Sequence, residues 1–166
     1  MAELNRDQRF LPCLLDRLRD DEPKNTEEGR NQRVISLQRY KEGVLRDLHW
    51  LFNASAHLPV EGKNNFTLDN YPEAKRSVLN FGTRQLCGLL APDMDYLEKE
   101  INEAIELFEP RIFRHGIAVR ASQERQIIAF EMKAELWAEP IPEQLFLKTV
   151  IDLESGQCAL KDSGNG

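Results

Sequence analysis

The chain has 166 residues, of which 41% are hydrophobic and 30% charged, and its formal net charge is −6. This length supports one domain with a hydrophobic core, and the acidic balance argues against a dedicated nucleic-acid-binding protein, which usually has a strongly basic face. Cys13, Cys87 and Cys158 are scattered, and neither an apolar leader nor an apolar run of membrane-spanning length is visible. The sequence therefore predicts a cytoplasmic protein with free thiols and no membrane insertion.

The N-terminal region contains a short amphipathic piece within residues 12–20. Leu14, Leu15 and Leu18 share one helical face, and charged residues including Arg17 lie opposite. A helix of about nine residues is marginal in water, so it must dock either on a partner or on its own domain. The polar residues 20–32 that follow predict a flexible linker. We thus expect a docking segment with a linker over residues 1–33, a single domain over 34–160 and a disordered tail over 161–166.

The longest helical stripe runs from Val34 to Phe52 and predicts a helix that ends near Ala54. Gly43 lies inside this helix and costs up to about 1 kcal/mol relative to alanine. Residues 56–70 have the composition of a loop. The short apolar piece over residues 77–81 fits a strand or a turn equally well.

A second amphipathic helix is predicted from about Met94 to Phe108, with Asp95 and Glu98 in the spacing of a capping box. Pro110 ends this helix, because its ring blocks continuation and forces the preceding residue out of the helical conformation. Glu109 and Arg111 flank the proline and point the same way in extended chain.

Three interpretations of the Glu109–Arg111 pair remain open at this point. It is a solvated surface ion pair, a partly buried pair that fixes the geometry of the junction, or an element that recognises another protein, with the arginine as anchor. The spacing of the residues does not choose between them.

Beyond Arg111 the hydrophobic period changes from helical to two, which is typical of strands. A polar turn is expected at residues 122–125, a hairpin turn at 154–157 and a short strand near 158–160. The alternating apolar residues are Ile117 and Val119, then Ile128, Phe130, Met132, Ala134 and Leu136, then Leu145, Leu147, Thr149, Ile151 and Leu153. Helices followed by an antiparallel meander predict an α+β fold with the helices on one face of the sheet.

The sequence contains no phosphate-binding glycine motif, no metal-ligand spacing around its three histidines and no nucleophile elbow. A glycosidase needs two carboxyl groups about 5–10 Å apart, one with a raised pKa. Glu109 beside Phe108 suits the second requirement, but the cation of Arg111 opposes it, and no second carboxylate stands out. We therefore expect no catalytic residue, metal or cofactor.

Five segments, read in order, resemble TssE, the small baseplate subunit of the bacterial type VI secretion system. That family is similar to the phage T4 baseplate wedge protein encoded by gene 25, which carries an old "lysozyme" label. The resemblance spans about residues 12–157. The segments are Leu14–Leu18 (SLLDRL in the family, with Cys13 for serine), Arg46–Asn53 (RDLxWLLN, with Phe52 for leucine), Ser77–Gly82 (SVLNYG), Ile105–Arg111 (IxxFEPR) and Leu153–Gly156 (a DLxTG-like turn).

The resemblance implies a structural subunit at the cytoplasmic face of the inner membrane. Its implied partners are the baseplate proteins TssF, TssG and TssK and the sheath proteins TssB and TssC, whose polymerisation it helps to start. Glu109, Pro110 and Arg111 match the family's hallmark, which is implicated in assembly. With Leu14, Leu15, Arg17 and Leu18 they form the expected protein-interaction residues. Two alternatives are a peptidoglycan hydrolase, following the inherited label, and a regulatory protein, because the fold family is similar to a bacterial anti-adaptor.

Overall fold

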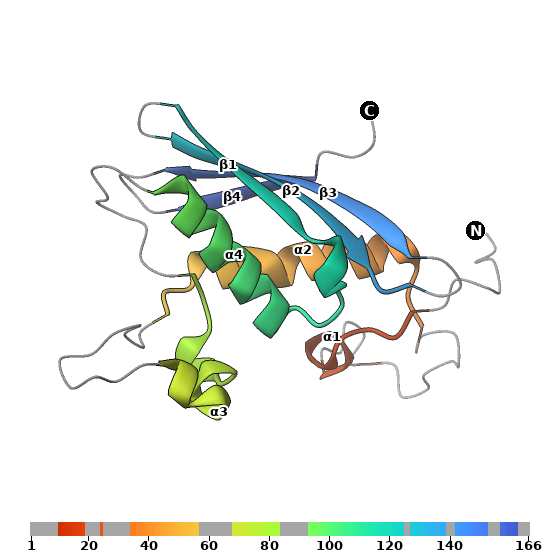
Figure 1. The fold of residues 1–166 in the computed structure, drawn as a ribbon. Coiled ribbons are helices and arrows are strands. Elements are labelled where there is room, and N and C mark those ends of the chain that lie inside the picture. The colour runs from red at the N-terminus through yellow and green to blue at the C-terminus, as the bar shows by residue number, and fades with distance from the viewer. Residues whose placement is uncertain are drawn as a thin grey trace.

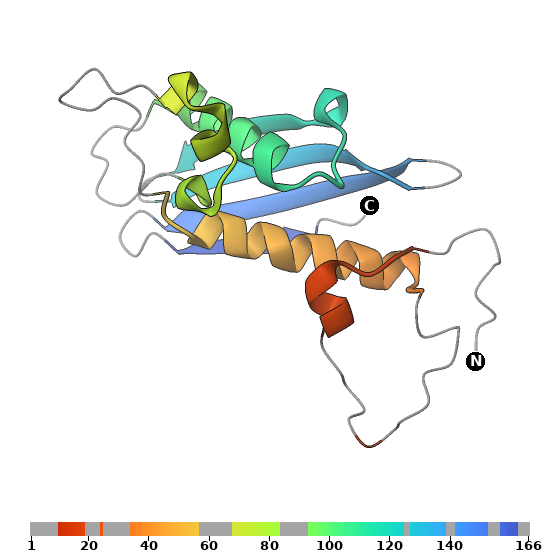
Figure 2. The same cartoon turned by 90° about the horizontal axis from the view of Figure 1, so that it is seen from below.

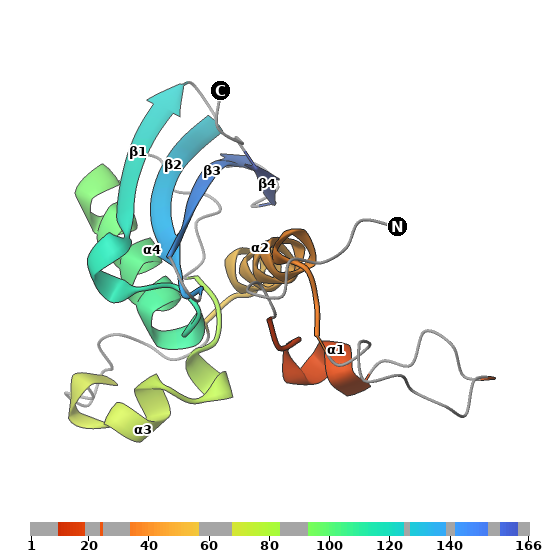
Figure 3. The same ribbon diagram turned by 90° about the vertical axis from the view of Figure 1, so that its right-hand side faces the viewer.

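The computed structural model describes residues 10–18, 24, 34–56, 68–83, 93–124, 127–138, 142–152 and 157–162. Within these ranges, two long helices pack on one face of a four-stranded antiparallel sheet with the strand order β1-β2-β3-β4 (Figures 1 and 3). The predicted α+β class is confirmed, with the helices on one side of the sheet. No helix in the described part of the chain is long and apolar enough to cross a membrane.

Helix α2 spans Leu37–Asn53, so the prediction that it begins near Val34 is wrong by one turn. Ser36 is the N-cap, and its hydroxyl accepts a hydrogen bond from the backbone N–H of Arg39. Val34 is not helical, and Ile35 pairs in antiparallel fashion with Phe10. The helix begins at the serine rather than at the first apolar residue of the pattern. The serine hydroxyl satisfies a backbone N–H of the first turn, whereas the side chain of Val34 has no acceptor for it.

Helix α4 spans Met94–Phe108, and its N-cap is Asp93 rather than the expected Asp95. The carboxylate of Asp93 accepts hydrogen bonds from the backbone N–H groups of Asp95 and Tyr96. Glu98 closes no capping box, because its carboxylate accepts the N–H of Ala121 in strand β1 at 2.6 Å. The helix ends where Pro110 predicts, and Glu109 is its non-helical C-cap.

The strands follow the predicted alternation, with corrections at their ends. Strand β1 (Ala118–Glu124) includes residues 122–124, which were expected in a turn, because these residues pair with residues 127–129 of the neighbouring strand. Strands β2 (Ile127–Leu136) and β3 (Glu143–Asp152) bury alternate residues against the helices. Strand β4 (Cys158–Asp162) runs two residues into the expected tail. The predicted hairpin turn and Leu153 lie largely outside the described residues.

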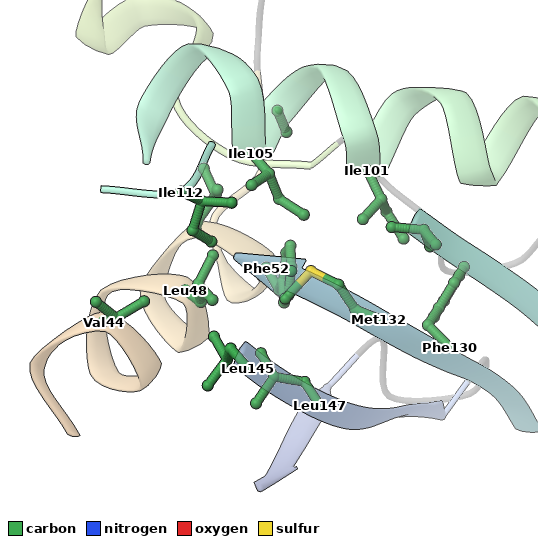
Figure 4. Packing of buried hydrophobic residues seen from close by; sticks show 14 of the residues in the cluster. Val44, Leu48, Phe52, Ile101, Ile105, Ile112, Phe130, Met132, Leu145 and Leu147 are labelled. Carbon is green, nitrogen blue, oxygen red and sulfur yellow. The ribbon is translucent and has the colours of Figure 1, made fainter. Parts of the chain in front are cut away.

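The core lies between the sheet and helices α2 and α4 (Figure 4). Leu48 of α2 and Ile105 of α4 are fully buried, and α2 also packs on β4. The side-chain amide of Asn53 ties the end of α2 to the start of β4, because it accepts the N–H of Cys158 and donates to the carbonyl of the same residue, both at 3.0 Å. Burial raises the pKa of the Cys158 thiol to about 12.

Shorter elements fill the connections. They are α1 (Leu14–Leu18), η2 (Leu68–Asn70), α3 (Pro72–Lys75), η3 (Val78–Asn80) and η4 (Arg114–Gly116). The unassigned piece over residues 77–81 is thus a 3-10 turn rather than a strand. The expected linker, apart from Lys24, and most of the predicted 56–70 loop lie outside the described residues.

Phe10 lies in the core although the sequence places it before the domain. Its ring stacks on Tyr40 with centroids 4.8 Å apart, and its backbone exchanges two hydrogen bonds with Ile35. Tyr40 in turn donates its hydroxyl to the carbonyl of Trp137, at 3.1 Å. The N-terminal segment is therefore joined to the domain, and the core begins before residue 34.

Two glycines give a matched prediction about stability. Gly82 has φ of +122°, and a Cβ there would lie 2.3 Å from the carbonyl oxygen of Ala54. Gly82→Ala should therefore lower the free energy of unfolding by at least about 2 kcal/mol. At Gly43 an added Cβ would make ordinary contacts of 3.6 and 3.8 Å, so Gly43→Ala should raise it by up to about 1 kcal/mol. Urea titration measures both, and equal effects would contradict the backbone geometry described here.

Candidate functional site

The site is built around the junction where α4 ends and the chain turns toward the sheet. Backbone hydrogen bonds fix this junction to the end of β2: the carbonyl of Arg111 accepts the N–H of Trp137 at 2.7 Å, and the N–H of Phe113 donates to Glu135. Ile112 is buried and forms a bridge with Leu136. The Glu-Pro-Arg segment is therefore held by the sheet on its C-terminal side and by α4 on its N-terminal side.

Glu109 and Arg111 form a two-pronged ion pair at this junction. Nε of Arg111 donates to Oε1 of Glu109 at 2.6 Å, and Nη2 donates to Oε2 at 2.5 Å. Glu109 is only 3% exposed, so the pair is not a solvated surface pair. Nη2 of Arg111 also donates to Oδ2 of Asp47 on α2, at 2.6 Å. A single guanidinium thus joins the end of α4 to the middle of α2, which agrees with the interpretation of a buried pair that fixes the junction.

The charge network continues from α2 to α1. Oδ1 of Asp47 accepts from Arg46 at 2.9 Å, and Nη1 of Arg46 donates to the carboxylate of Asp16 on α1. The thiol of Cys13 donates to Asp16 at 3.0 Å and accepts from Arg46 at 3.3 Å. Five charged side chains form one chain of ion pairs across three helices, in the order Asp16, Arg46, Asp47, Arg111 and Glu109.

The network shifts the pKa values of Arg111, Arg46 and Asp16. Burial alone would lower the pKa of Arg111, but Glu109 and Asp47 outweigh it, and the net pKa is raised. The pKa of Arg46 is raised, mainly by its hydrogen bond to Asp16. The same bond is the main cause that lowers the pKa of Asp16 below its usual value. The hydrogen bonds of the network thus favour the charged forms of Arg111, Arg46 and Asp16.

A groove of about 420 Å³ lies beside this network. Its walls come from α1, from α2 and from the C-terminal end of α4 together with the residues after it. Most of the side chains that line it are apolar. They are Cys13, Leu15, Asp47, Leu48, Trp50, Leu51, Phe81, Phe108, Glu109, Pro110 and Arg111. The guanidinium of Arg46 lies over the ring of Trp50, 5.1 Å from its centroid. This is a concave apolar surface with a fixed polar edge, a shape suited to binding.

The predicted interaction residues gather around this groove, with different exposures. Glu109 and Arg111 form its polar edge, while Pro110 and Leu15 line it with exposed side chains. Leu14 and Leu18 are 70% and 74% exposed. Arg17 is also exposed on α1. The structure therefore brings the N-terminal segment and the Glu-Pro-Arg segment together at one surface, although they lie far apart in the sequence.

Sequence reasoning missed three members of the network, namely Asp16, Arg46 and Asp47. Asp16 and Arg46 are 30 residues apart, and Asp47 and Arg111 are 64 apart, so no local spacing connects them. The signal was the adjacent Arg46-Asp47 pair on the helix, because these neighbouring charges serve two further partners, Asp16 and Arg111. Among the described residues, no group of three or more possible metal ligands occurs.

Comparison with known families relates most of the chain to one of them. Residues 38–141, more than half of the chain, match the family described as baseplate wedge protein gp25. The matched range contains α2, α4 and strands β1 and β2, and with them Arg46, Asp47, Glu109 and Arg111. It leaves out α1 and strands β3 and β4. No individual curated protein matches the chain.

The burial of the network predicts a large effect on stability. Arg111→Ala leaves the carboxylate of Glu109 buried without its partner, which should cost about 3–5 kcal/mol of folding free energy. Arg114→Ala, in the exposed 3-10 turn η4 three residues later, is the matched control and should stay within about 0.5 kcal/mol. Thermal and urea unfolding measure both variants. Similar small losses in the two would mean that Arg111 is merely a surface arginine.

Proposed function

Because the chain belongs to the gp25 family of baseplate wedge proteins, we propose that it is the TssE-type baseplate subunit of a bacterial type VI secretion system. Family membership itself gives the protein a structural role in a phage-like baseplate. In that system the protein would also help to start the polymerisation of the sheath.

One observation carries this proposal. Three of the segments that resemble TssE, at residues 14–18, 46–53 and 105–111, lie far apart in the sequence, yet the ion-pair network joins all three. The same three segments supply most of the groove. Because three segments that resemble one family meet at one surface, we infer that they serve a common function there. An apolar groove with exposed leucines beside it suits protein binding.

The proposed partners are the wedge subunits TssF and TssG, with TssK attached to them, and the sheath proteins TssB and TssC. The groove is the surface that we assign to wedge assembly, with Leu15, Trp50 and Pro110 as its exposed apolar contacts. Arg111 contributes by holding the groove in shape before the partner arrives, which reduces the entropy lost on binding. Such a subunit acts at the cytoplasmic face of the inner membrane, where the baseplate is built.

We further propose that the protein is not an enzyme, despite the "lysozyme" label of its relatives. A general acid must hold a proton that it can deliver. Both oxygens of Glu109 instead accept hydrogen bonds from Arg111. Asp47 accepts from two arginines, and Asp16 accepts from Arg46. Each of these three carboxylates is held by arginine as a hydrogen-bond acceptor, which suits a structural network rather than the delivery of a proton in glycoside hydrolysis.

The two tryptophans give a matched test of the assembly surface. Trp50 lines the groove and Trp137 lies outside it, and their side chains are similarly exposed, at 47% and 51%. Trp50→Ala should weaken binding to a co-expressed TssF–TssG complex by at least about 2 kcal/mol, as aromatic hot-spot residues do. Trp137→Ala should bind as the unchanged protein does.

Co-purification and titration calorimetry measure these affinities. Failure of the unchanged protein to bind TssF and TssG would overturn the secretion-system assignment. Equal binding by both variants would move the assembly surface away from the groove.

A second experiment addresses hydrolysis. The purified protein should release no soluble fragments from peptidoglycan, and Glu109→Gln should give the same background, because the carboxylate is already committed to Arg111. Chromatography of the digests, with an active lysozyme as positive control, detects the products. Turnover that is lost in Glu109→Gln would contradict the structural role.

A further inference from the structure

Helix α1 docks on the domain in an unusual orientation. An amphipathic helix normally buries its apolar face, but here Leu14 and Leu18 are 70% and 74% exposed, and Leu11, just before the helix, is 72% exposed. The polar side of α1 faces α2, where Cys13 and Asp16 both accept hydrogen bonds from Arg46. The thiol of Cys13 also donates to Asp16. Figures 2 and 3 both show α1 beside α2, on the side away from the sheet. Polar contacts rather than apolar burial therefore hold this helix.

The segment is attached at two points of different character. Phe10 is buried, stacked on Tyr40 and paired through its backbone with Ile35. The second point is the ion pair between Asp16 and Arg46, whose side chains are 28% and 31% exposed. An ion pair that water reaches opens more readily than a buried contact, whereas a buried aromatic ring stays packed. The first point has the properties of a hinge, and the second those of a latch.

The latch also shares its charges with the Glu-Pro-Arg junction. Arg46 holds one oxygen of Asp47, and Arg111 holds the other. Asp16 and Arg111 approach each other over Gly43, since an added Cβ at that residue would lie 3.6 Å from Asp16 and 3.8 Å from Arg111. The cation of Arg111 thus attracts Asp16 directly and also competes with Arg46 for Asp47. Without Arg111 in this place, Asp16 loses that attraction. Asp47 is then also free to draw Arg46 away from Asp16, so the ion pair between Asp16 and Arg46 weakens for both reasons.

Helix α1 is also part of the groove, because Cys13 and Leu15 form one of its walls. We propose that α1 is a hinged wall of the groove, which pivots at Phe10, is latched by Asp16 to Arg46, and is coupled through Asp47 to Arg111. A protein partner that draws Arg111 away from Asp47 then loosens α1 and frees its leucines to contact the same partner. The coupling is reciprocal: release of α1 changes the free energy that holds Arg111 in the network by the same amount that release of Arg111 changes the free energy that holds α1. This inference rests on the proposed function only in treating the groove as a binding surface.

Hydrogen exchange of two backbone amides separates the latch from the hinge in the isolated protein. The N–H of Arg17 is bonded to Cys13 within α1, and the N–H of Ile35 is bonded to Phe10 at the hinge. In Asp16→Asn the Arg17 amide should exchange at least about fivefold faster, with the Ile35 amide within about twofold of its original rate. Glu106→Gln, on the exposed side of α4, removes one charge elsewhere and should change neither amide. An unchanged Arg17 amide in Asp16→Asn, or equal acceleration of both amides, would overturn the hinge and latch.

The coupling has its own test in Arg111→Lys, which keeps the charge but loses the planar fork. This variant should accelerate exchange of the Arg17 amide at least about threefold in the original background and leave it unchanged in the Asp16→Asn background. The same acceleration in both backgrounds, or none in either, would show that the two sites are independent. A second measurement does not depend on the stability of Arg111→Lys. The Nε–H resonance of Arg111, which reports its bond to Glu109, should shift in Asp16→Asn and stay in place in Glu106→Gln. A fixed resonance in Asp16→Asn would overturn the coupling.

These measurements need no baseplate partner. Contrary results in these measurements would refute the hinge at α1 but would not affect the proposed role in assembly. Failure to bind TssF and TssG would remove the secretion-system assignment and leave the mechanics of α1 intact.

Discussion

The arrangement of this protein depends on one guanidinium shared by two carboxylates from different helices. Arg111 pairs with Glu109 at the end of α4 and with Asp47 in α2. Charge therefore holds the two helices together in addition to the apolar core, to which Leu48 and Ile105 both belong (Figure 4). Removing charges from water is costly, and only multiple well-formed hydrogen bonds compensate. Pro110 helps to form these bonds, because its ring restricts the backbone between Glu109 and Arg111 before their side chains pair.

Much of the fold follows from local patterns in the sequence. The alternation from Ile128 to Leu136 predicts strand β2 because a period of two places every second side chain on the buried face, and all five of those residues are buried. The end of α4 is equally predictable from Pro110. The errors occur where side chains compete for backbone groups: Ser36 and Asp93, rather than the apolar period, decide where the helices begin. Capping is a local signal, but several candidate caps stand near each start, and only the folded backbone selects one.

The site was predictable in part. The sequence pointed to Glu109 and Arg111 and left their burial open, since a residue's exposure depends on elements that are distant along the chain. Periodicity also identified the apolar face of α1, but it does not say whether that face turns inward. The orientation of α1 is set by Arg46, which binds Asp16, and by Gly43, whose missing side chain lets Asp16 approach α2. An ionic anchor on one side of a short helix overrides the usual orientation when the apolar side is too small to bury itself alone.

The bond between Asn53 and Cys158 bears on how the chain folds during synthesis. The strands pair in sequence order, so each hairpin closes from neighbouring residues at a small entropic cost. Helix α2 is different, because it packs on β4 and its last residue bonds to a residue 105 positions later. In a nascent chain, the part of α2 that packs on β4 therefore stays uncovered until β4 has left the ribosome. During that interval this helix is a natural substrate for chaperones that bind exposed apolar segments.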